Sequence, residues 1–174
     1  AVNTASITPT ATSTVTDTGT MTATPTHTFG PGQDWYLAVW PAGFAHLNDF
    51  SSVVCNGKMW VIEGYHDMNE TPAIWSTIDG LSWVLETESP GYPWRRGQAS
   101  VVFDSKMWII GGSADAATWY SDVWSSTDGT SWTQVTADAG FDGRDAHTVL
   151  AYDSKLWVIG GYRYDVIPIR LNDV

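Results

Sequence analysis

The stretch Lys106-Met107-Trp108-Ile109-Ile110-Gly111-Gly112 decides the fold, because the chain contains two close relatives of it. They occupy Lys58–Gly64 and Lys155–Gly161, at steps of 48 and 49 residues. A second motif keeps the same step, since Trp75–Trp83 matches Trp124–Trp132. Self-similarity at about 50 residues, in units with room for four short strands, is typical of β-propeller blades and not of a helical solenoid.

Each unit is interpreted as four antiparallel strands, named a to d. Strand a is a short apolar run such as Val101–Phe103, followed by a tight turn. Strand b carries the Lys-x-Trp-x-Ile pattern and ends in the glycine pair, which permits positive φ and a close approach of backbone. A variable connection leads to strand c, which is predicted to end at Trp75 or Trp124. An Asp-Gly turn then leads to strand d, predicted to open with Trp83 or Trp132.

These motifs resemble the kelch repeat of galactose-oxidase-type β-propellers. The resemblance rests on the glycine doublet, the later aromatic pair, the Arg that opens each following unit and His147 three residues after Arg144. The c–d turns are also similar to the Asp boxes of sialidase-like propellers, one residue shorter. The resemblance covers roughly residues 33–174, but the first unit departs from it at Leu47 and Glu63. It implies these structural repeat positions: Trp60, Trp108, Trp157, Gly111, Gly112, Gly160, Gly161, Trp75, Trp124, Trp83, Trp132, Asp79, Gly80, Asp128, Gly129 and Arg144.

The N-terminal residues 1–32 have a different composition and are predicted to be a disordered stalk or linker. Threonine occupies every even position from Thr8 to Thr28, with two prolines and almost no bulky apolar residue between. Such a segment cannot offset its ordering entropy. Its composition is that of O-glycosylated stalks and resembles the Thr-Pro spacers of bacterial cell-surface domains.

Residues 33–174 are predicted to form a partial ring of about three blades, an all-β kelch-type propeller. Residues 33–40 are expected to form a lone outer strand, 41–86 blade 1, 95–136 blade 2, and 144–174 an incomplete blade 3. Because Leu171–Val174 matches Tyr120–Val123, a strand c is expected next. The preferred hypothesis is a fragment of a six- or seven-bladed propeller that has further blades. The alternative is a ring assembled from several short chains.

Composition narrows the classes of partner. The net charge of −11 disfavours nucleic acid and anionic membranes, because the phosphates would repel the chain. No run of eighteen apolar residues exists, so no membrane span is expected. A single cysteine, Cys55, excludes an intrachain disulfide. We expect a secreted or cell-surface protein of bacterial type.

Ligand binding is expected on the b–c and d–a connections, because variable loops on a rigid scaffold concentrate binding residues. Aromatic side chains mixed with Arg and carboxylates suit sugar stacking or protein contact. The candidates are Tyr65, His66, Trp94, Arg95, Trp119, Tyr120, Tyr162, Arg163 and Tyr164, with the carboxylates of Asp67, Glu70, Asp115 and Asp165 nearby.

No catalytic residue, metal ligand or cofactor is assigned. The histidines His46, His66 and His147 lack metal-ligand spacing, and Cys55 lies in an apolar slot of strand a. Arg95 and Arg144 fit a structural hydrogen-bonding role, and Asp79 and Asp128 fit turns. The leading hypothesis is therefore a recognition module for protein or glycan. The alternatives are a carbohydrate-active enzyme (sialidase-like, sialic-acid isomerase-like or galactose-oxidase-like) completed by missing blades, and an architectural spacer.

Overall fold

The structure is a computed structural model that describes residues 47–62, 64, 72–164 and 167–174. The predicted stalk, 1–32, and the predicted lone strand, 33–40, lie outside the described residues. So do Glu63 and the residues 65–71 and 165–166.

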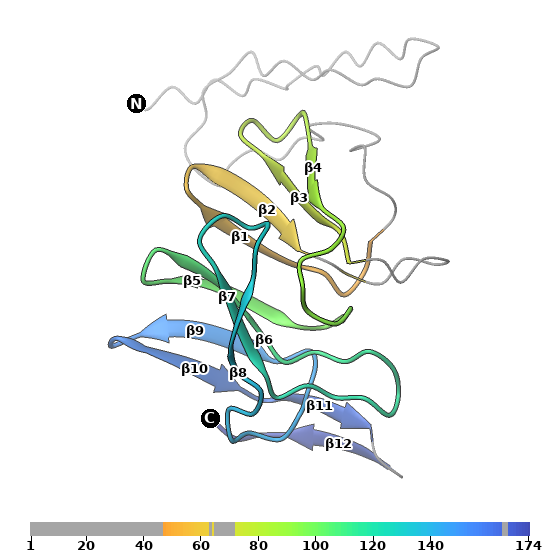
Figure 1. Cartoon of the computed structure of the whole chain (residues 1–174). Coiled ribbons are helices and arrows are strands. Elements are labelled where there is room, and N and C mark those ends of the chain that lie inside the picture. The colour runs from red at the N-terminus through yellow and green to blue at the C-terminus, as the bar shows by residue number, and fades with distance from the viewer. Residues whose placement is uncertain (1–46, 63, 65–71, 165–166) are drawn as a thin grey trace, which may run out of the picture.

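The described chain is all-β, and it contains no helix within those residues. Two four-stranded antiparallel sheets form blades 1 and 2, and a two-stranded hairpin begins blade 3 (Figure 1). This arrangement confirms the prediction of a partial β-propeller. Blade 1 is β1 (Ser51–Cys55), β2 (Lys58–Ile62), β3 (Ile74–Thr77) and β4 (Val84–Thr87); blade 2 is β5 (Ala99–Phe103), β6 (Lys106–Ile110), β7 (Val123–Ser126) and β8 (Thr133–Thr136); blade 3 starts with β9 (Thr148–Tyr152) and β10 (Lys155–Ile159).

The connection after β10 contains a hairpin that the sequence interpretation left as a variable loop. It consists of β11 (Gly161–Tyr164) and β12 (Pro168–Leu171). Two other strand boundaries also differ from the prediction. Trp75 and Trp124 stand second in their strands and not last, and β4 and β8 begin one residue after Trp83 and Trp132. In both blades the register of strands c and d shifts just before the tryptophan of strand c, which is a β-bulge in the repeat.

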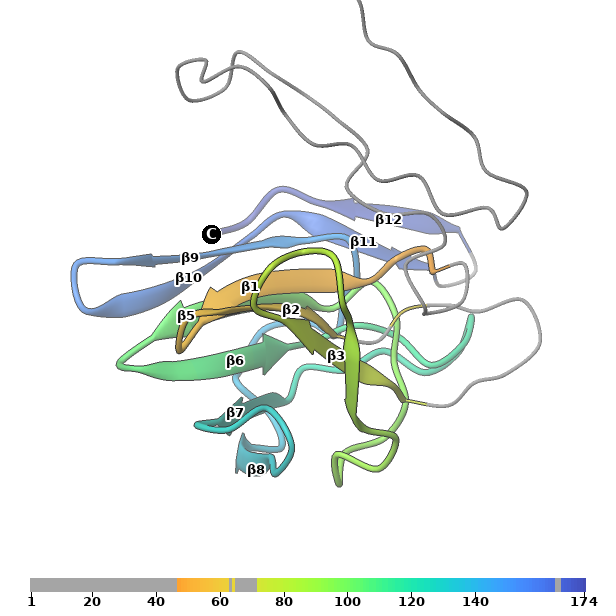
Figure 2. The same cartoon turned by 90° about the horizontal axis from the view of Figure 1, so that it is seen from above.

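The blades pack through two opposite faces of their a–b hairpins. We call the face that carries Trp60, Trp108 or Trp157 the Trp face, and the face that carries Met59, Met107 or Leu156 the Met face. Figure 2 shows the three a–b hairpins running alongside one another. In each junction the Trp face of one blade meets the Met face of the next.

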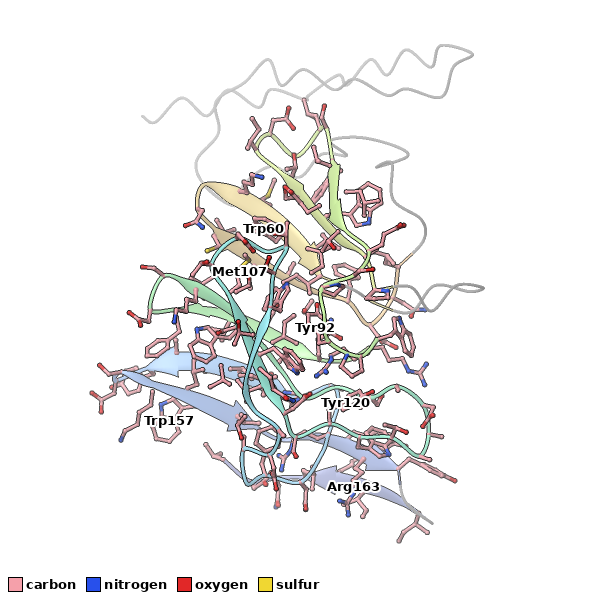
Figure 3. All side chains as sticks on the ribbon, viewed as in Figure 1. Trp60, Tyr92, Met107, Tyr120, Trp157 and Arg163 are labelled. Atoms are coloured by element: carbon pink, nitrogen blue, oxygen red, sulfur yellow. The ribbon has the colours of Figure 1, made fainter. Side chains whose placement is uncertain are left out.

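Two apolar clusters fill these junctions. Between blades 1 and 2, Trp60 and Ile62 pack in one buried cluster with Met107 and Ile109 (Figure 3). Between blades 2 and 3, the Trp face of blade 2 packs against the Met face of β9–β10. That second cluster contains Ile110 and Val149, with Val101, Trp108, Leu156 and Val158 against it.

The c–d turn of blade 2 covers the tryptophan of blade 1. A Cβ added at Gly129 would lie 2.2 Å from the Trp60 ring, so only glycine fits there. Asn56 Nδ2 donates to the Thr127 carbonyl at 3.0 Å beside this contact. The Trp60 indole, in turn, donates to the Cys55 carbonyl at 3.1 Å. The Asp-Gly turn therefore closes its own hairpin and also caps the neighbouring blade.

In blades 2 and 3 a buried arginine ties the b–c connection to the entry of its blade. Arg95 is 0% exposed and donates to both carboxylate oxygens of Asp122, at 2.6 and 3.0 Å, and to the Gly111 carbonyl at 3.0 Å. Its guanidinium also lies 4.3 Å from the Tyr120 ring centroid. We call this unit the arginine clamp. It orders the residues on either side of the b–c loop, because one rigid fork satisfies groups from the ends of two strands.

The clamp recurs in blade 3. Arg144 donates to Asp173 at 2.5 and 2.7 Å and to the Gly160 carbonyl at 2.8 Å. The guanidinium lies over the Phe141 ring, the counterpart of Tyr92 near Arg95. The same chemistry one period later shows that the clamp is a property of the repeat.

Removing the acid of the first clamp should lower the free energy of unfolding far more than breaking a half-exposed ion pair. Asp122→Ala is expected to lower the free energy of unfolding by about 3–5 kcal/mol, because it leaves a buried charge without its partner. Lys58→Met, which removes the 2.7 Å ion pair with Glu86, should cost about 1 kcal/mol or less. Denaturant unfolding measures both, and equal losses would contradict the clamp.

A backbone ladder joins the residues that precede each strand a. The Gly97 amide donates to the Asp49 carbonyl and the Ala146 amide donates to the Gly97 carbonyl, each at 2.8 Å. All three residues adopt positive φ, at 53°, 61° and 51° in chain order. The left-handed conformation turns the backbone toward the next blade, so the ladder links blades 1, 2 and 3 where they enter the array.

Two substitutions in this ladder, Gly97→Ala and Ala146→Gly, should have opposite effects on the free energy of unfolding. Gly97→Ala is expected to destabilise by about 1–2 kcal/mol or more, because its φ is positive and its Cβ would lie 2.8 Å from the Asp145 Cβ. Ala146→Gly should be neutral or stabilise by up to about 1 kcal/mol, because it relieves the same backbone strain. Thermal unfolding compares them; a stabilising Gly97→Ala would refute the ladder geometry.

Candidate functional site

The b–c and d–a connections lie on one face of the array, which we call the loop face. The Arg96 and Ser113 backbones exchange hydrogen bonds at 2.9 Å, and the Gly112 amide donates to the Arg144 carbonyl at 2.8 Å. Asp145 and Tyr162 are bridged in the same way. The first and third contacts tie the b–c connection of one blade to the entry of the same blade, and the second joins blade 2 to blade 3, so the side chains on the loop face stand on a fixed backbone.

A polar cluster marks the seam between blades 2 and 3 on this face. The Ser113 hydroxyl donates to Asp145 Oδ2 at 2.9 Å. Partial burial raises the pKa of the Asp145 carboxyl, while the Ser113 hydrogen bond and the charge of Arg96 act against that rise. The negative charge of Asp49 adds to the rise. Arg96, Ser113 and Asp145 thus combine a cation, a hydroxyl and a half-buried acid, and the sequence interpretation missed all three.

An aromatic pair lies beside the polar cluster. The rings of Trp119 and Tyr162 meet edge to face, with centroids 5.9 Å apart. Trp119 belongs to the b–c loop of blade 2 and Tyr162 to β11, so the structure brings together two predicted residues from different blades. The Trp119 indole nitrogen is buried and has no hydrogen-bond partner within the described residues.

The β11–β12 hairpin presents the other predicted residues of blade 3. Tyr164 is exposed near its tip. Arg163 is half-buried, with its guanidinium 3.7 Å from the Asp142 carboxylate (Figure 3). Because side chains alternate along a strand, Tyr162 and Tyr164 share one face of the hairpin and Arg163 points to the other.

Three predicted residues of blade 2 are less accessible than the sequence suggested. Arg95 was predicted to be a binding residue on the surface, but its side chain is wholly buried in the arginine clamp. It is buried because Asp122 and the Gly111 carbonyl take up its hydrogen bonds. Tyr120 is half-buried against that guanidinium, and Trp94 is half-buried with its indole nitrogen inside. The repeat position of Arg95 was the signal that favoured a structural role.

Several candidates of blade 1 and blade 3 lie outside the described residues. They are Tyr65, His66, Asp67, Glu70 and Asp165.

The acids of the c–d turns serve the turns themselves. Asp128 Oδ1 accepts from the Thr130 and Ser131 amides, each at 2.8 Å, and these bonds lower its pKa to about 2. Asp79 accepts in the same way from Leu81 and Ser82, which also lowers its pKa. Among the residues that the structure describes, no three His, Cys, Asp or Glu side chains are grouped to hold a metal ion.

His147 lies in the junction beneath the loop face. Its ring is buried, and both ring nitrogens lack a well-formed hydrogen bond to any described residue. Burial first, and the charge of Arg144 second, lower its pKa to about 4, while the backbone of Ile110 offsets part of the shift. Gln98 occupies the equivalent position in blade 2 and donates to the Ile62 carbonyl at 2.9 Å.

Acid should destabilise the fold through His147. The folded state keeps the imidazole neutral down to about pH 4, whereas the unfolded chain takes up the proton near pH 6.5. The contribution of His147 is therefore complete above pH 6.5 and is lost as the pH falls, at up to about 1.4 kcal/mol per pH unit. His147→Gln, which copies Gln98, should flatten the stability profile between pH 7 and pH 5.5. An unchanged profile in that variant would contradict the assignment.

Comparison with known proteins gives evidence for the fold but none for the role of the candidate site. No protein family and no curated protein matches the sequence. Among solved structures the chain is similar to that of YjhT, with a TM-score of 0.51 and 18% identity. The similarity covers 69% of this chain and 36% of the YjhT chain, so this chain spans about a third of that protein's length. At this identity the likeness supports the propeller fold alone.

In the part of the chain that the structure describes, no helix is long and apolar enough to cross a membrane.

Proposed function

We propose that this chain is a kelch-type recognition module, secreted or displayed at the cell surface, whose loop face binds a glycan or a protein without chemical turnover. The observation that carries the proposal is the aromatic pair Trp119–Tyr162 at the blade seam, with Tyr164 exposed on the same strand. Rigid aromatic side chains supply contact area at low entropic cost.

The polar groups around the pair favour a glycan as the first ligand to test. The cluster Arg96, Ser113 and Asp145 offers donors and acceptors beside the rings, because Ser113 and Asp145 are bridged to Trp119 and Tyr162. The ion pair Arg163–Asp142 lies on the other face of the hairpin. Sugars present hydroxyl groups next to apolar ring faces, so this mixture of side chains suits them. The net charge of −11 argues against nucleic acid as the partner.

The kelch assignment and the location rest on sequence features. The glycine pairs Gly111–Gly112 and Gly160–Gly161 and the clamp arginines recur with the blade period. The Thr-rich residues 8–28 have the composition of an extracellular stalk. Labelling of intact cells with an antibody against the chain tests the location directly.

A glycan array probed with the 174-residue chain tests the binding proposal. Tyr164→Ala and Tyr162→Ala should each weaken any glycan that is retained by roughly five- to thirtyfold, the equivalent of about 1–2 kcal/mol. Val135→Ala, on the outer strand β8, serves as the matched control and should leave affinity unchanged. If both tyrosine variants bind the glycan as tightly as the unaltered chain, the glycan binds elsewhere on the molecule. If the chain captures a protein and no glycan, the ligand is a protein.

The half-buried Asp145 favours one alternative, a carbohydrate-active enzyme. An acid with a raised pKa beside a hydroxyl and an arginine is a feature of catalytic sites as well as of structural clusters. Turnover of a bound glycan, lost in Asp145→Asn while binding remains, would favour the enzyme. If the chain binds the glycan and releases it chemically unchanged, the recognition module is favoured.

A further inference from the structure

The residue just before strand a differs between the two junctions. Between blades 1 and 2 it is Gln98, whose Nε2 donates to the Ile62 carbonyl at 2.9 Å. Between blades 2 and 3 it is His147, which lies against the backbone of Ile110, the counterpart of Ile62. His147 is 7% exposed, and neither ring nitrogen makes a well-formed hydrogen bond to a described residue. A buried polar ring without partners costs free energy, so its place in the second junction calls for a role other than stability.

The imidazole packs directly on the backbone of both blades. A Cβ added at Gly111 of blade 2 would lie 2.9 Å from His147 Cε1. A Cβ added at Gly161 of blade 3 would lie 2.8 Å from His147 Cβ. The Phe141 ring lies on a further side, with its centroid 6.4 Å from that of the imidazole. A change in the charge of this ring therefore acts on the backbone of two blades at once.

A proton on His147 would find like charge and no free acid. The charged groups on the elements around it are Asp142, Arg144 and Asp145 on its own entry segment, Arg95 and Asp122 of the clamp at Gly111, Arg163 on β11, and Asp173 beyond β12. Each of the four acids already bonds an arginine or a serine. The charge of Arg144 opposes protonation of the imidazole, which adds to the effect of burial.

The segment that precedes His147 supports both rings of the aromatic pair. A Cβ added at Gly143 would lie 2.6 Å from the Trp119 carbonyl, so this segment packs on the backbone that carries the indole. Asp145 and Tyr162 exchange backbone hydrogen bonds at 2.9 and 3.0 Å. Because His147 follows this segment directly, a displacement of His147 moves the supports of both rings.

We propose that protonation of His147 opens the seam between blades 2 and 3 and separates Trp119 from Tyr162, so that the loop face holds its ligand at neutral pH and releases it in acid. The release rests on the proposed function, whereas the opening of the seam needs no ligand. The closed seam holds the pKa of His147 at about 4, below its ordinary value of 6.5, so acid favours the open seam. A ligand that binds only the closed seam opposes protonation to the same extent.

NMR spectroscopy of the 174-residue chain, from pH 7 to below pH 4, tests the opening without a ligand. Nuclear Overhauser cross-peaks between the rings of Trp119 and Tyr162, 5.9 Å apart, report the closed seam. Cross-peaks between Tyr92 and Trp132, 5.6 Å apart in the first junction, are the matched control. The seam cross-peaks should disappear with the midpoint of the His147 ring titration, while the control cross-peaks persist.

The variant His147→Gln separates this residue from Asp145, which also faces the seam and whose pKa is raised by burial. The substitution copies Gln98 and leaves Asp145 in place, so its seam cross-peaks should persist over the whole range. If the variant does not fold, the midpoints in the unaltered chain decide, because the seam must open with the His147 ring and not with the Asp145 carboxyl. Seam cross-peaks that survive after the His147 ring has titrated would overturn the proposal. Loss of the seam and control cross-peaks together would also overturn it, because the chain then simply unfolds.

A glycan retained by the array supplies the second measurement. Its affinity for the unaltered chain should fall by roughly tenfold or more in acid, within the range of known couplings between sites, and should stay unchanged in His147→Gln. A glycan that stays bound while the seam opens would contradict the release. An open seam in acid with no glycan retained at neutral pH would count against the proposed function and leave the switch standing.

Discussion

The arginine clamp is the constraint on which the rest of the array depends. Arg95 is buried without solvent, so its charge is tolerable only because Asp122, the Gly111 carbonyl and nearby aromatic rings satisfy it together. Those partners stand at the end of strand b and the start of strand c, on either side of the variable loop. The clamp thus lets the b–c loop vary in sequence while its two ends stay fixed, and this is what a binding face on a propeller needs.

Junction packing follows from the same repeat. In both junctions the Trp face of one a–b hairpin meets the Met face of the next, and in the first junction Gly129 lets its Asp-Gly turn lie against the Trp60 ring. An isolated blade would leave both of these faces in contact with water, because a single sheet has nothing to cover either of its two sides. Stability is therefore shared between neighbours, as in other repeat proteins. Residues at a junction, such as His147, affect two blades at once.

Much of this fold could be predicted from the sequence, because the strands, turns and faces repeat and each repeat is local. The Lys-x-Trp-x-Ile pattern identifies β2, β6 and β10 as equivalent strands, and the Asp-Gly pairs identify the turns. The clamp acids Asp122 and Asp173 were aligned without a role, because no local pattern links them to arginines that lie 27 and 29 residues earlier. The cluster of Ser113 with Asp145 was missed for a similar reason, because it exists only where loops of different blades meet. The β11–β12 hairpin is local, and it was missed because the connection after β10 was interpreted as a variable loop.

The loop face gains its rigidity from backbone bonds between blades, and a recognition surface on it depends on that rigidity. Native-state hydrogen exchange tests this claim most directly. The amides of Gly97, Gly112 and Ala146 donate across blade boundaries, so they should exchange as slowly as amides in the central strands β2 and β6. Exchange of these three amides at the rate of exposed loops, with β2 and β6 protected, would show that the blades fold separately and would contradict the account.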